Sequence, residues 1–225
     1  YYPNGSLACH VLGFTGRDDQ GLVCGVEVAL DRYLAGKAGR IISPVDSKGN
    51  ALPYAEETRI EPENGYSAVL TIDAGIQSIV ENVLEEVTAT WNVSEGCAAI
   101  VMEPTTGNIL AFASNPGFDL NNPYACPVTV DPTGWTGTTA EDVETLSSTV
   151  WRNKCLTDTY EPGSTFKAIT ASMGVEEGIV NADSQVNDSP LSMSGWDIRC
   201  WKREGHGIES FSTAVKNSCN AVFAK

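Results

Sequence analysis

A helix-breaking Pro162-Gly163 pair stands directly before a segment of helical periodicity, and this junction constrains the fold more than any other part of the chain. Residues 164–177 carry apolar side chains at an approximately helical spacing, which predicts a helix with Ser164 in its first turn. Residues three apart share one face of a helix, so Lys167 lies next to the serine. The sequence therefore predicts a hydroxyl and an amine side by side at the start of a helix.

Ser164 and Lys167 form a candidate nucleophile and base. The positive end of the helix dipole disfavours a further cation and burial disfavours an ammonium group, so both effects lower the pKa of the lysine. A neutral amine takes the proton of a neighbouring serine and activates it as a nucleophile. Ser-x-x-Lys arises about once by chance in a chain of this length, so an ordinary surface helix is the alternative.

The tripeptide Ser218-Cys219-Asn220 is a second candidate element, 54 residues beyond Ser164. It follows residues 208–217, for which we predict a short helix. Ser218 and Asn220 are two residues apart, so a turn directs both side chains into one cleft, where the hydroxyl relays a proton and Asn220 holds a substrate amide. A helix N-cap is the simpler alternative for a Ser-x-Asn sequence.

The sequence around both motifs resembles the transpeptidase domain of class B penicillin-binding proteins, the bacterial enzymes that cross-link peptidoglycan in processes such as cell division and spore-cortex formation. Matching stretches follow the family's order: Leu70-Thr71-Ile72-Asp73, Ile76-Gln77, 100–111, 113–119, Arg152-Asn153, 160–167, Cys200-Trp201 and His206-Gly207. Upstream stretches resemble the pedestal that precedes this domain: Tyr2-Pro3, Ala8, His10, Leu12-Gly13, Gly21-Leu22, Gly25-Val26-Glu27 and Leu34-Ala35-Gly36. The resemblance covers nearly the whole chain.

The resemblance implies an α+β fold in which helices pack on a mainly antiparallel sheet. Residues 1–66 are expected to form part of a non-catalytic pedestal, and residues 67–225 the N-terminal part of the transpeptidase domain. Hydrophobic periodicity and turn residues predict the individual elements. We expect helices at 21–35, 76–91 and 140–150, strands at 40–45, 58–61 and 67–72, a turn at 46–50, a hairpin of 98–103 with 108–113, and a loop at 115–139.

The same resemblance implies a penicillin-binding peptidoglycan transpeptidase that works through a serine acyl-enzyme. Ser164 is then the nucleophile acylated by a peptidoglycan stem peptide or by a β-lactam antibiotic, and Lys167 is the base. Ser218 shuttles a proton and Asn220 positions the substrate. No cofactor and no metal is expected. Further partners are membrane proteins of cell-wall synthesis or division.

The chain departs from the family pattern in one respect. The third family motif, Lys-Thr/Ser-Gly, does not occur, and the sequence ends five residues after Asn220. We therefore expect residues 1–225 alone to be poorly active. No run of about 18 apolar residues is present. The family implies an extracytoplasmic location at the bacterial cell membrane through an N-terminal anchor that this sequence lacks.

Two other classes of function stay open. A β-lactam sensor would use the same acylation of Ser164 as a signal, without turnover. A non-catalytic interaction fragment of a cell-wall synthesis complex would bind an assembly partner and stay inert to penicillin. A β-lactamase fits less well, since no deacylating carboxylate is assigned. Nucleic acid is excluded as a partner, because 29 acidic against 14 basic residues give a formal charge of −15.

Seven cysteines without a Cys-x-x-Cys sequence do not predict a metal site, and Cys200 with His206 lacks the usual spacing of zinc ligands. His206, next to a glycine, is expected to be a structural hydrogen-bonding residue. Cys200 and Cys219 are a possible redox pair, because 19 residues allow a loop to fold back and an extracytoplasmic location permits oxidation. A disulfide there would displace Ser218 and Asn220. Two reduced core cysteines are the alternative.

Overall fold

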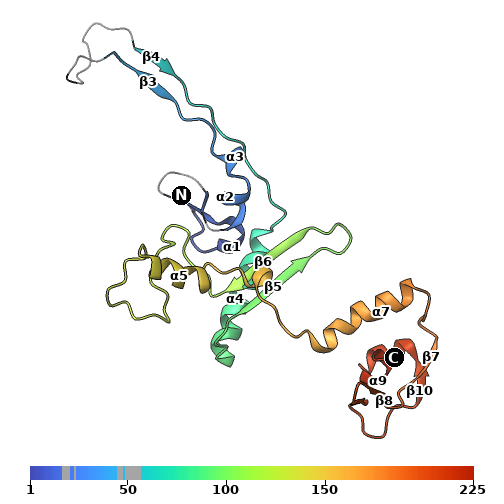
Figure 1. The fold of residues 1–225 in the computed structure, drawn as a ribbon. Helices are drawn as coiled ribbons and strands as arrows, with labels where there is room; N and C mark the ends of the chain where they lie inside the picture. The colour runs from blue at the N-terminus through green and yellow to red at the C-terminus, as the bar shows by residue number, and fades with distance from the viewer. Residues whose placement is uncertain (17–20, 23, 45–47, 49–56) are drawn as a thin grey trace. The chain divides into compact units, whose positions relative to one another are not determined.

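The structure is a computed structural model that describes residues 1–16, 21–22, 24–44, 48 and 57–225 (Figure 1). These residues form two compact units, Tyr1–Asp158 and Thr159–Lys225, and each is described by itself. Both units combine helices with antiparallel strand pairs, which confirms the predicted α+β class. None of the described helices has the length and apolar character needed to span a bilayer. The domain boundary proposed after residue 66 stays a prediction.

The first unit contains six helices and six strands among its described residues. In chain order they are α1 (Cys9–Leu12), β1 (Phe14–Thr15), β2 (Gly21–Leu22), α2 (Gly25–Ala29), α3 (Asp31–Leu34), β3 (Arg40–Ile42), β4 (Thr58–Ile60), α4 (Ala74–Trp91), β5 (Cys97–Met102), β6 (Ile109–Asn115), α5 (Ala140–Ser148) and α6 (Lys154–Thr157). Strands β1 and β2, β3 and β4, and β5 and β6 pair antiparallel. The apolar core lies around α1, α5 and the loop after β6, and consists of Cys9, Phe14, Phe118, Leu120, Leu146, Val150 and Trp151.

The β5–β6 hairpin and helix α4 confirm the prediction for this part of the sequence. Helix α4 packs on β6 (Figure 1). It begins after Asp73, whose carboxylate accepts a hydrogen bond from the backbone N–H of Ile76 at 2.9 Å. The hairpin contains a register shift between Val101 and Met102. Helix α5 and the loop before it are also as predicted.

Gln77 joins α4 to β6 through its buried side chain, and the residue is 0% exposed. Its Oε1 accepts a hydrogen bond from the Phe112 backbone N–H at 2.7 Å, and its Nε2 donates to the Phe112 carbonyl at 3.1 Å. Nε2 also donates to Glu81 Oε1 at 2.7 Å. The Gln77 amide therefore pairs the N–H and the carbonyl of Phe112, as a further strand beside β6 would otherwise do.

We predict that Gln77→Leu destabilises the packing of α4 on the hairpin by about 2–4 kcal/mol, because each buried polar group left unpaired costs roughly 1–3 kcal/mol. Hydrogen exchange of the α4 and β6 amides in the full-length protein measures this change. The matched control is Gln185→Leu, since Gln185 is exposed and its side chain makes only a 3.4 Å hydrogen bond. Equal amide protection in the Gln77 variant and the wild type would contradict the prediction.

Two predictions for the first unit are wrong. The helix expected at 21–35 begins only at Gly25 and is interrupted at Leu30, where φ is −112°. Residues 21–22 pair as a strand instead, and Gly25 has φ +81° and lies so close to Gly13 that a Cβ would meet the Gly13 nitrogen at 2.5 Å. This close approach fixes where the helix starts.

The segment 67–72, all of it described, forms no strand. It is attached to β6 only at its end, where Thr71 Oγ1 donates to the Ile109 carbonyl at 2.7 Å and the Asp73 N–H donates to the Leu110 carbonyl at 2.9 Å. The strands predicted at 40–45 and 58–61 are present as β3 and β4, but the turn predicted at 46–50 lies, except for residue 48, outside the described residues.

The second unit holds both candidate motifs. Its elements are η1 (Gly163–Phe166, a 3₁₀ turn), α7 (Lys167–Glu176), β7 (Gln185–Asn187), β8 (Leu191–Met193), β9 (Trp196–Ile198), β10 (Ile208–Ser210), α8 (Phe211–Lys216) and α9 (Asn220–Phe223). The helix predicted at 208–217 is therefore a short strand followed by a helix, because β10 pairs with β7 and Ser210 caps α8. The small core of the unit lies at α8 and α9 and consists of Phe211, Ala214, Cys219, Ala221 and Val222.

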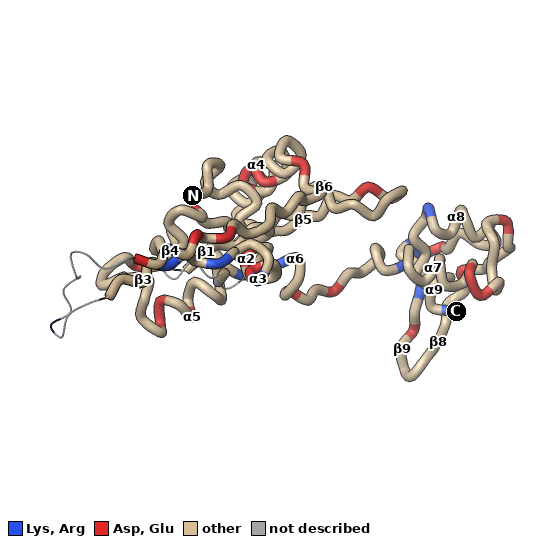
Figure 2. The backbone as a smooth tube through the Cα atoms, turned by 90° about the horizontal axis from the view of Figure 1, so that it is seen from above, with Lys and Arg blue, Asp and Glu red and all other residues tan. Residues whose placement is uncertain are grey.

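Acidic residues are distributed along the backbone of both units rather than concentrated in one segment (Figure 2). Asp142 has a local role, since it completes a capping box with Thr139 at the start of α5. The scattered distribution agrees with solvated faces and identifies no binding surface for a cation.

Candidate active site

The first motif forms a tight turn that leads into a helix. Gly163 has φ +56°, a left-handed conformation that favours glycine, and the 3₁₀ turn η1 follows. Ser164 is exposed in this turn, and α7 begins three residues later at Lys167. Among the described residues no hydrogen-bond partner lies within reach of Ser164 Oγ. The serine is thus accessible, but it lies in the 3₁₀ turn before α7 and not in the first turn of the helix as predicted. The hydrogen bonds of Lys167 go to Ser218 and Asn220, not to Ser164.

Lys167 Nζ lies within hydrogen-bond distance of three oxygen atoms. It is 2.7 Å from the Ser218 carbonyl, 3.0 Å from Ser218 Oγ and 2.5 Å from Asn220 Oδ1. The ammonium group is also 5.5 Å from the centre of the Phe223 ring, a cation–π distance. The structure therefore brings Lys167, Ser218 and Asn220 into one constellation, as the sequence predicts.

The turn between α8 and α9 presents Ser218 and Asn220 because Cys219 is buried between them. Ser218 has φ +51°, and the Cys219 N–H donates to the Ala214 carbonyl at 3.1 Å. Cys219 is 0% exposed and belongs to the core of the unit. With the middle side chain held inward, the residues on either side reach Lys167.

Burial lowers the pKa of Lys167 below its ordinary value, while charge interactions with Cys219 and Cys200 oppose this shift. A neutral amine has two N–H donors and one lone pair. When Lys167 loses a proton, one of its three hydrogen bonds must therefore change direction, so that the partner donates and the amine accepts. Of the three partners only the Ser218 hydroxyl can donate a hydrogen bond to the neutral amine.

The other predicted pair, Cys200 and Cys219, consists of free thiols in the same unit. Their Sγ atoms lie close to the side chains of Asp188 and His206, and all four ligand atoms are within 4.8 Å of one another. His206 is hydrogen-bonded, as expected, since its Nδ1 is 3.2 Å from Cys200 Sγ. Sequence reasoning did not single out Asp188, because nothing in its neighbourhood marks it as a ligand.

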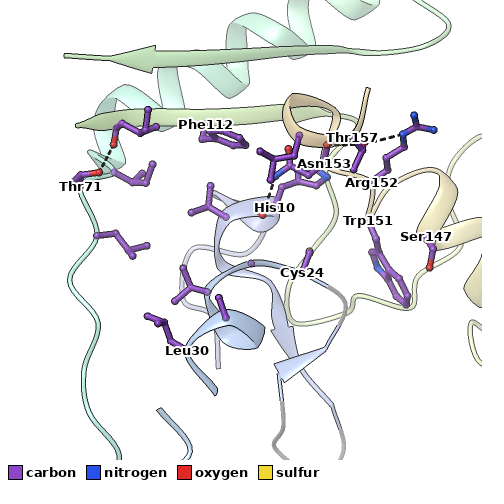
Figure 3. Close-up of a pocket in the computed structure, with 18 residues that line it drawn as sticks. His10, Cys24, Leu30, Thr71, Phe112, Ser147, Trp151, Arg152, Asn153 and Thr157 are labelled. Carbon is purple, nitrogen blue, oxygen red and sulfur yellow. Dashed lines mark hydrogen bonds between the residues drawn. The ribbon is translucent and has the colours of Figure 1, made fainter. Parts of the chain in front are cut away.

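A cavity of about 630 Å³ lies elsewhere, in the first unit (Figure 3). Its walls are mainly apolar. His10 Nε2 is 2.8 Å from the Val150 carbonyl, and Asn153 Nδ2 donates to the His10 carbonyl at 3.4 Å. Neither predicted motif contributes to this cavity, so the candidate chemistry is confined to the second unit.

Comparison with known proteins gives the family. Residues 97–225, more than half of the chain, match the profile described as penicillin binding protein transpeptidase domain. Over 228 aligned residues the chain is 36% identical to stage V sporulation protein D of Bacillus subtilis, with 100% of this chain and 32% of that protein covered. It is 30% identical to peptidoglycan D,D-transpeptidase FtsI of Escherichia coli K12, with 88% and 30% covered.

Solved structures agree with this match. Penicillin binding protein 3 from Mycobacterium tuberculosis is 25% identical, with a TM-score of 0.66 and coverage of 99% of this chain and 42% of that one. A peptidoglycan synthetase from Bifidobacterium adolescentis has the same fold, with a TM-score of 0.72 at 21% identity and coverage of 99% and 36%. The chain spans about a third of the length of the curated relatives named above. The resemblance seen in the sequence is confirmed, and the chain belongs to the penicillin binding protein transpeptidase family.

Proposed function

We propose that the chain is the part of a peptidoglycan D,D-transpeptidase that carries the acylating serine. One observation supports this most: Lys167 Nζ, one helical turn after Ser164, contacts Ser218 Oγ at 3.0 Å and Asn220 Oδ1 at 2.5 Å. This arrangement unites a base, a proton relay and a polar anchor beside an exposed hydroxyl. A relative's name gives the reaction class, a peptidoglycan D,D-transpeptidase, and stem peptides of peptidoglycan are the substrate that we propose.

In the proposed reaction, neutral Lys167 accepts the proton of Ser164, and Ser164 Oγ attacks the carbonyl carbon of a stem-peptide amide bond. The oxyanion accepts a hydrogen bond from the Ser164 backbone N–H. When the C–N bond breaks, the leaving amine receives a proton from Lys167 through the Ser218 hydroxyl, and an ester stays on Ser164. The amine of a second stem peptide then attacks the ester and gives up one proton to Lys167. The bond between the acyl carbon and Ser164 Oγ breaks, Ser164 takes this proton from Lys167, and the new amide bond is the cross-link.

Asn220 is proposed to orient the substrate through its amide. Its Oδ1 holds Lys167 and leaves the Nδ2 donors for a substrate carbonyl. A β-lactam enters the same reaction because its ring contains an amide bond. Opening of that ring leaves the amine tethered to the acyl group, so the acceptor amine is kept out and the ester persists.

We further propose that the active protein works outside the bacterial cell membrane, held there by an N-terminal anchor. Residues 1–66 would form its pedestal. Cell-wall synthesis or division membrane proteins would be its partners. Fractionation of cells that express the full-length protein tests the location, and an exclusively cytoplasmic protein would contradict it.

Penicillin acylation tests the proposed function. The full-length protein is incubated with benzylpenicillin, and intact-mass analysis is expected to show one stable adduct, which peptide mapping assigns to residues 160–167. With a stem-peptide donor and an amine acceptor, a cross-linked product is expected. A protein that stays unmodified by penicillin and forms no product would be an interaction module instead, and rapid release of hydrolysed penicillin would indicate a β-lactamase.

We also predict that Cys200 and Cys219 form a redox pair that controls the site. Both are free thiols near one another. Two-electron oxidation by a small disulfide such as oxidised glutathione would join the two Sγ atoms and yield two reduced glutathione molecules. The bond would pull the turn that carries Ser218, and acylation is expected to fall by about a hundredfold, because angstrom-scale displacement of catalytic groups has effects of this size.

The redox prediction is checked by comparing penicillin acylation rates after oxidation and after reduction. Cys200→Ser should be insensitive to the treatment, whereas the control Cys126→Ser should respond like the wild type. Equal rates in oxidised and reduced wild-type protein, with the disulfide verified by mass, would show that no such control exists.

A further inference from the structure

Asn217, the residue before the turn that carries Ser218, is held by two side chains that the proposed reaction does not use. It follows the last residue of α8, and its N–H donates to the Thr213 carbonyl at 2.8 Å. The last carbonyls of a helix have no N–H donor within the helix. Trp201 Nε1 is the donor for the Asn217 carbonyl, at 2.8 Å. The side chain is held as well, because Asn217 Nδ2 donates to Glu209 Oε2 at 2.7 Å.

Ser218 has a backbone conformation that needs such support. Its φ of +51° lies in the left-handed region, where a residue with a Cβ is strained and where the position after a helix is usually glycine. Glycine would remove the strain, but it has no hydroxyl to contact Lys167. A residue other than glycine keeps this conformation only where the surrounding contacts determine it. The two contacts of Asn217 act directly before the strained residue.

Trp201 is placed by its polar atom rather than by burial. The residue is 66% exposed, so apolar packing does not account for its position. Its indole N–H is bound to the Asn217 carbonyl, and its ring meets the His206 ring in a T-shaped contact with 5.6 Å between the centroids. Trp196 in β9 is 77% exposed, and its indole has no hydrogen bond to any described residue. Of the two tryptophans in the second unit, Trp201 is therefore the one tied to the end of α8.

Glu209 holds the side chain of the same asparagine from strand β10. The strand is itself fixed, because Glu209 lies opposite Val186 in the pairing of β10 with β7. Its Oε2 accepts the hydrogen bond from Asn217, and a hydrogen bond to a carboxylate is stronger than one between neutral groups. Its Oε1 is buried without a hydrogen-bond partner among the described residues. The bond to Asn217 is thus the polar contact that this carboxylate makes inside the second unit.

We propose that Trp201 and Glu209 are positioning residues, which fix Asn217 and so keep Ser218 in its contact with Lys167. Trp201 restrains the backbone before the turn, and Glu209 ties the Asn217 side chain to β10. With Asn217 fixed on both sides, Ser218 Oγ stays 3.0 Å and the Ser218 carbonyl 2.7 Å from Lys167 Nζ. Neither Trp201 nor Glu209 has a hydrogen bond to Lys167, so both act through the turn.

Hydrogen exchange of the full-length protein tests these contacts without penicillin, so their failure and the failure of the proposed function are distinguishable. The N–H groups of Ser218 and Cys219 donate to carbonyls of α8 at 3.0 and 3.1 Å, and their protection depends on the turn. Trp201→Phe, which removes the indole N–H, is expected to speed their exchange about threefold to tenfold, the size expected for the loss of one hydrogen bond. The matched control Trp196→Phe should exchange like the wild type. Wild-type exchange of both amides in Trp201→Phe would overturn the proposal.

The effect on acylation rests on the proposed function and is measured in the same full-length protein. Trp201→Phe and Asn217→Ala are expected to slow the covalent step with benzylpenicillin about tenfold to a hundredfold, because they displace a group that relays the proton. The dissociation constant of the complex before the covalent step should stay unchanged, and every molecule should still become acylated in the end. A merely structural role would lower the acylated fraction and leave the rate constant of the remaining molecules unchanged. That result, or a wild-type rate constant in Trp201→Phe, would refute the positioning role.

Two replacements test Glu209. Glu209→Gln keeps an oxygen acceptor for Asn217 Nδ2, so its acylation rate should stay within about fivefold of the wild type, whereas Glu209→Ala should be as slow as Asn217→Ala. The double variant should be no slower than either single variant, because both changes remove the same hydrogen bond. The control Glu204→Ala, at an exposed position in the loop before β10, should acylate like the wild type. Equal rates in the two Glu209 variants, or additive effects of Glu209→Ala and Asn217→Ala, would contradict the role of Glu209.

Discussion

Replacement of Ser164 by alanine is expected to abolish covalent modification by penicillin. The hydroxyl oxygen is the atom that forms the ester in the proposed reaction. The next hydroxyl in the same turn, Thr165 Oγ1, donates to the Pro162 carbonyl at 2.6 Å. Ser218 is hydrogen-bonded to Lys167 but sits on a left-handed turn at the end of α8, and in the proposed reaction it relays the proton. Intact-mass analysis of the full-length variant after incubation with benzylpenicillin should therefore show only unmodified protein.

The control for this variant is Ser172→Ala, five residues beyond Lys167 on the same helix. Ser172 Oγ donates to the Ala168 carbonyl at 2.8 Å and has no contact with Lys167, so acylation should proceed at the wild-type rate. An adduct that persists in the Ser164 variant would show that another residue is the nucleophile. Peptide mapping of that adduct would then identify the true position, with Ser218 as the first candidate.

Sequence reasoning predicts the fold best where one local pattern decides it. Helix α4 combines an apolar stripe with the cap at Asp73, and the hairpin follows from two strands around a Pro-Thr-Thr-Gly turn. The predictions are wrong where contacts between residues far apart in the sequence determine the structure. Residues 21–22 pair with β1 rather than join the helix after them, and residues 67–73 make only two hydrogen bonds to β6. Periodicity does not carry information of this kind.

In the candidate site too, spacing along the sequence predicts some relations between residues and not others. Ser164 lies in η1 and Lys167 at the start of α7, and this closeness along the chain follows from their spacing alone. The contact of Lys167 with Asn220 joins residues 53 apart. The family resemblance placed both residues in one site, but neither it nor the spacing predicted this contact. Asp188 was not predicted as a site residue, because it lies near Cys200 and His206 only in the folded chain. The spacing of these three residues in the sequence also matches no familiar metal-binding motif.

Lys167→Arg is expected to lower the acylation rate by about 10²-fold to 10⁴-fold, the usual contribution of a general base. Arginine keeps the positive charge and still donates hydrogen bonds to the Ser218 carbonyl and to Asn220 Oδ1, the acceptors now used by Lys167. It stays protonated in proteins and has no lone pair for the Ser164 proton. The turn should therefore survive while proton transfer fails. Stopped-flow measurement of acylation by a fluorescent penicillin gives the rate, and circular dichroism gives the fold.

Lys167→Ala separates the base from a purely electrostatic role, because it removes both the charge and the base. If proton transfer is what Lys167 supplies, the arginine and alanine variants should be slow to a similar degree. If charge and hydrogen bonding to the turn are what matter, arginine should be far faster than alanine. Lys216→Arg, a matched change in the last turn of α8, should acylate like the wild type. A rate for Lys167→Arg close to that of Lys216→Arg would rule out base catalysis by this residue, and the Ser164 proton would then have to leave by another route.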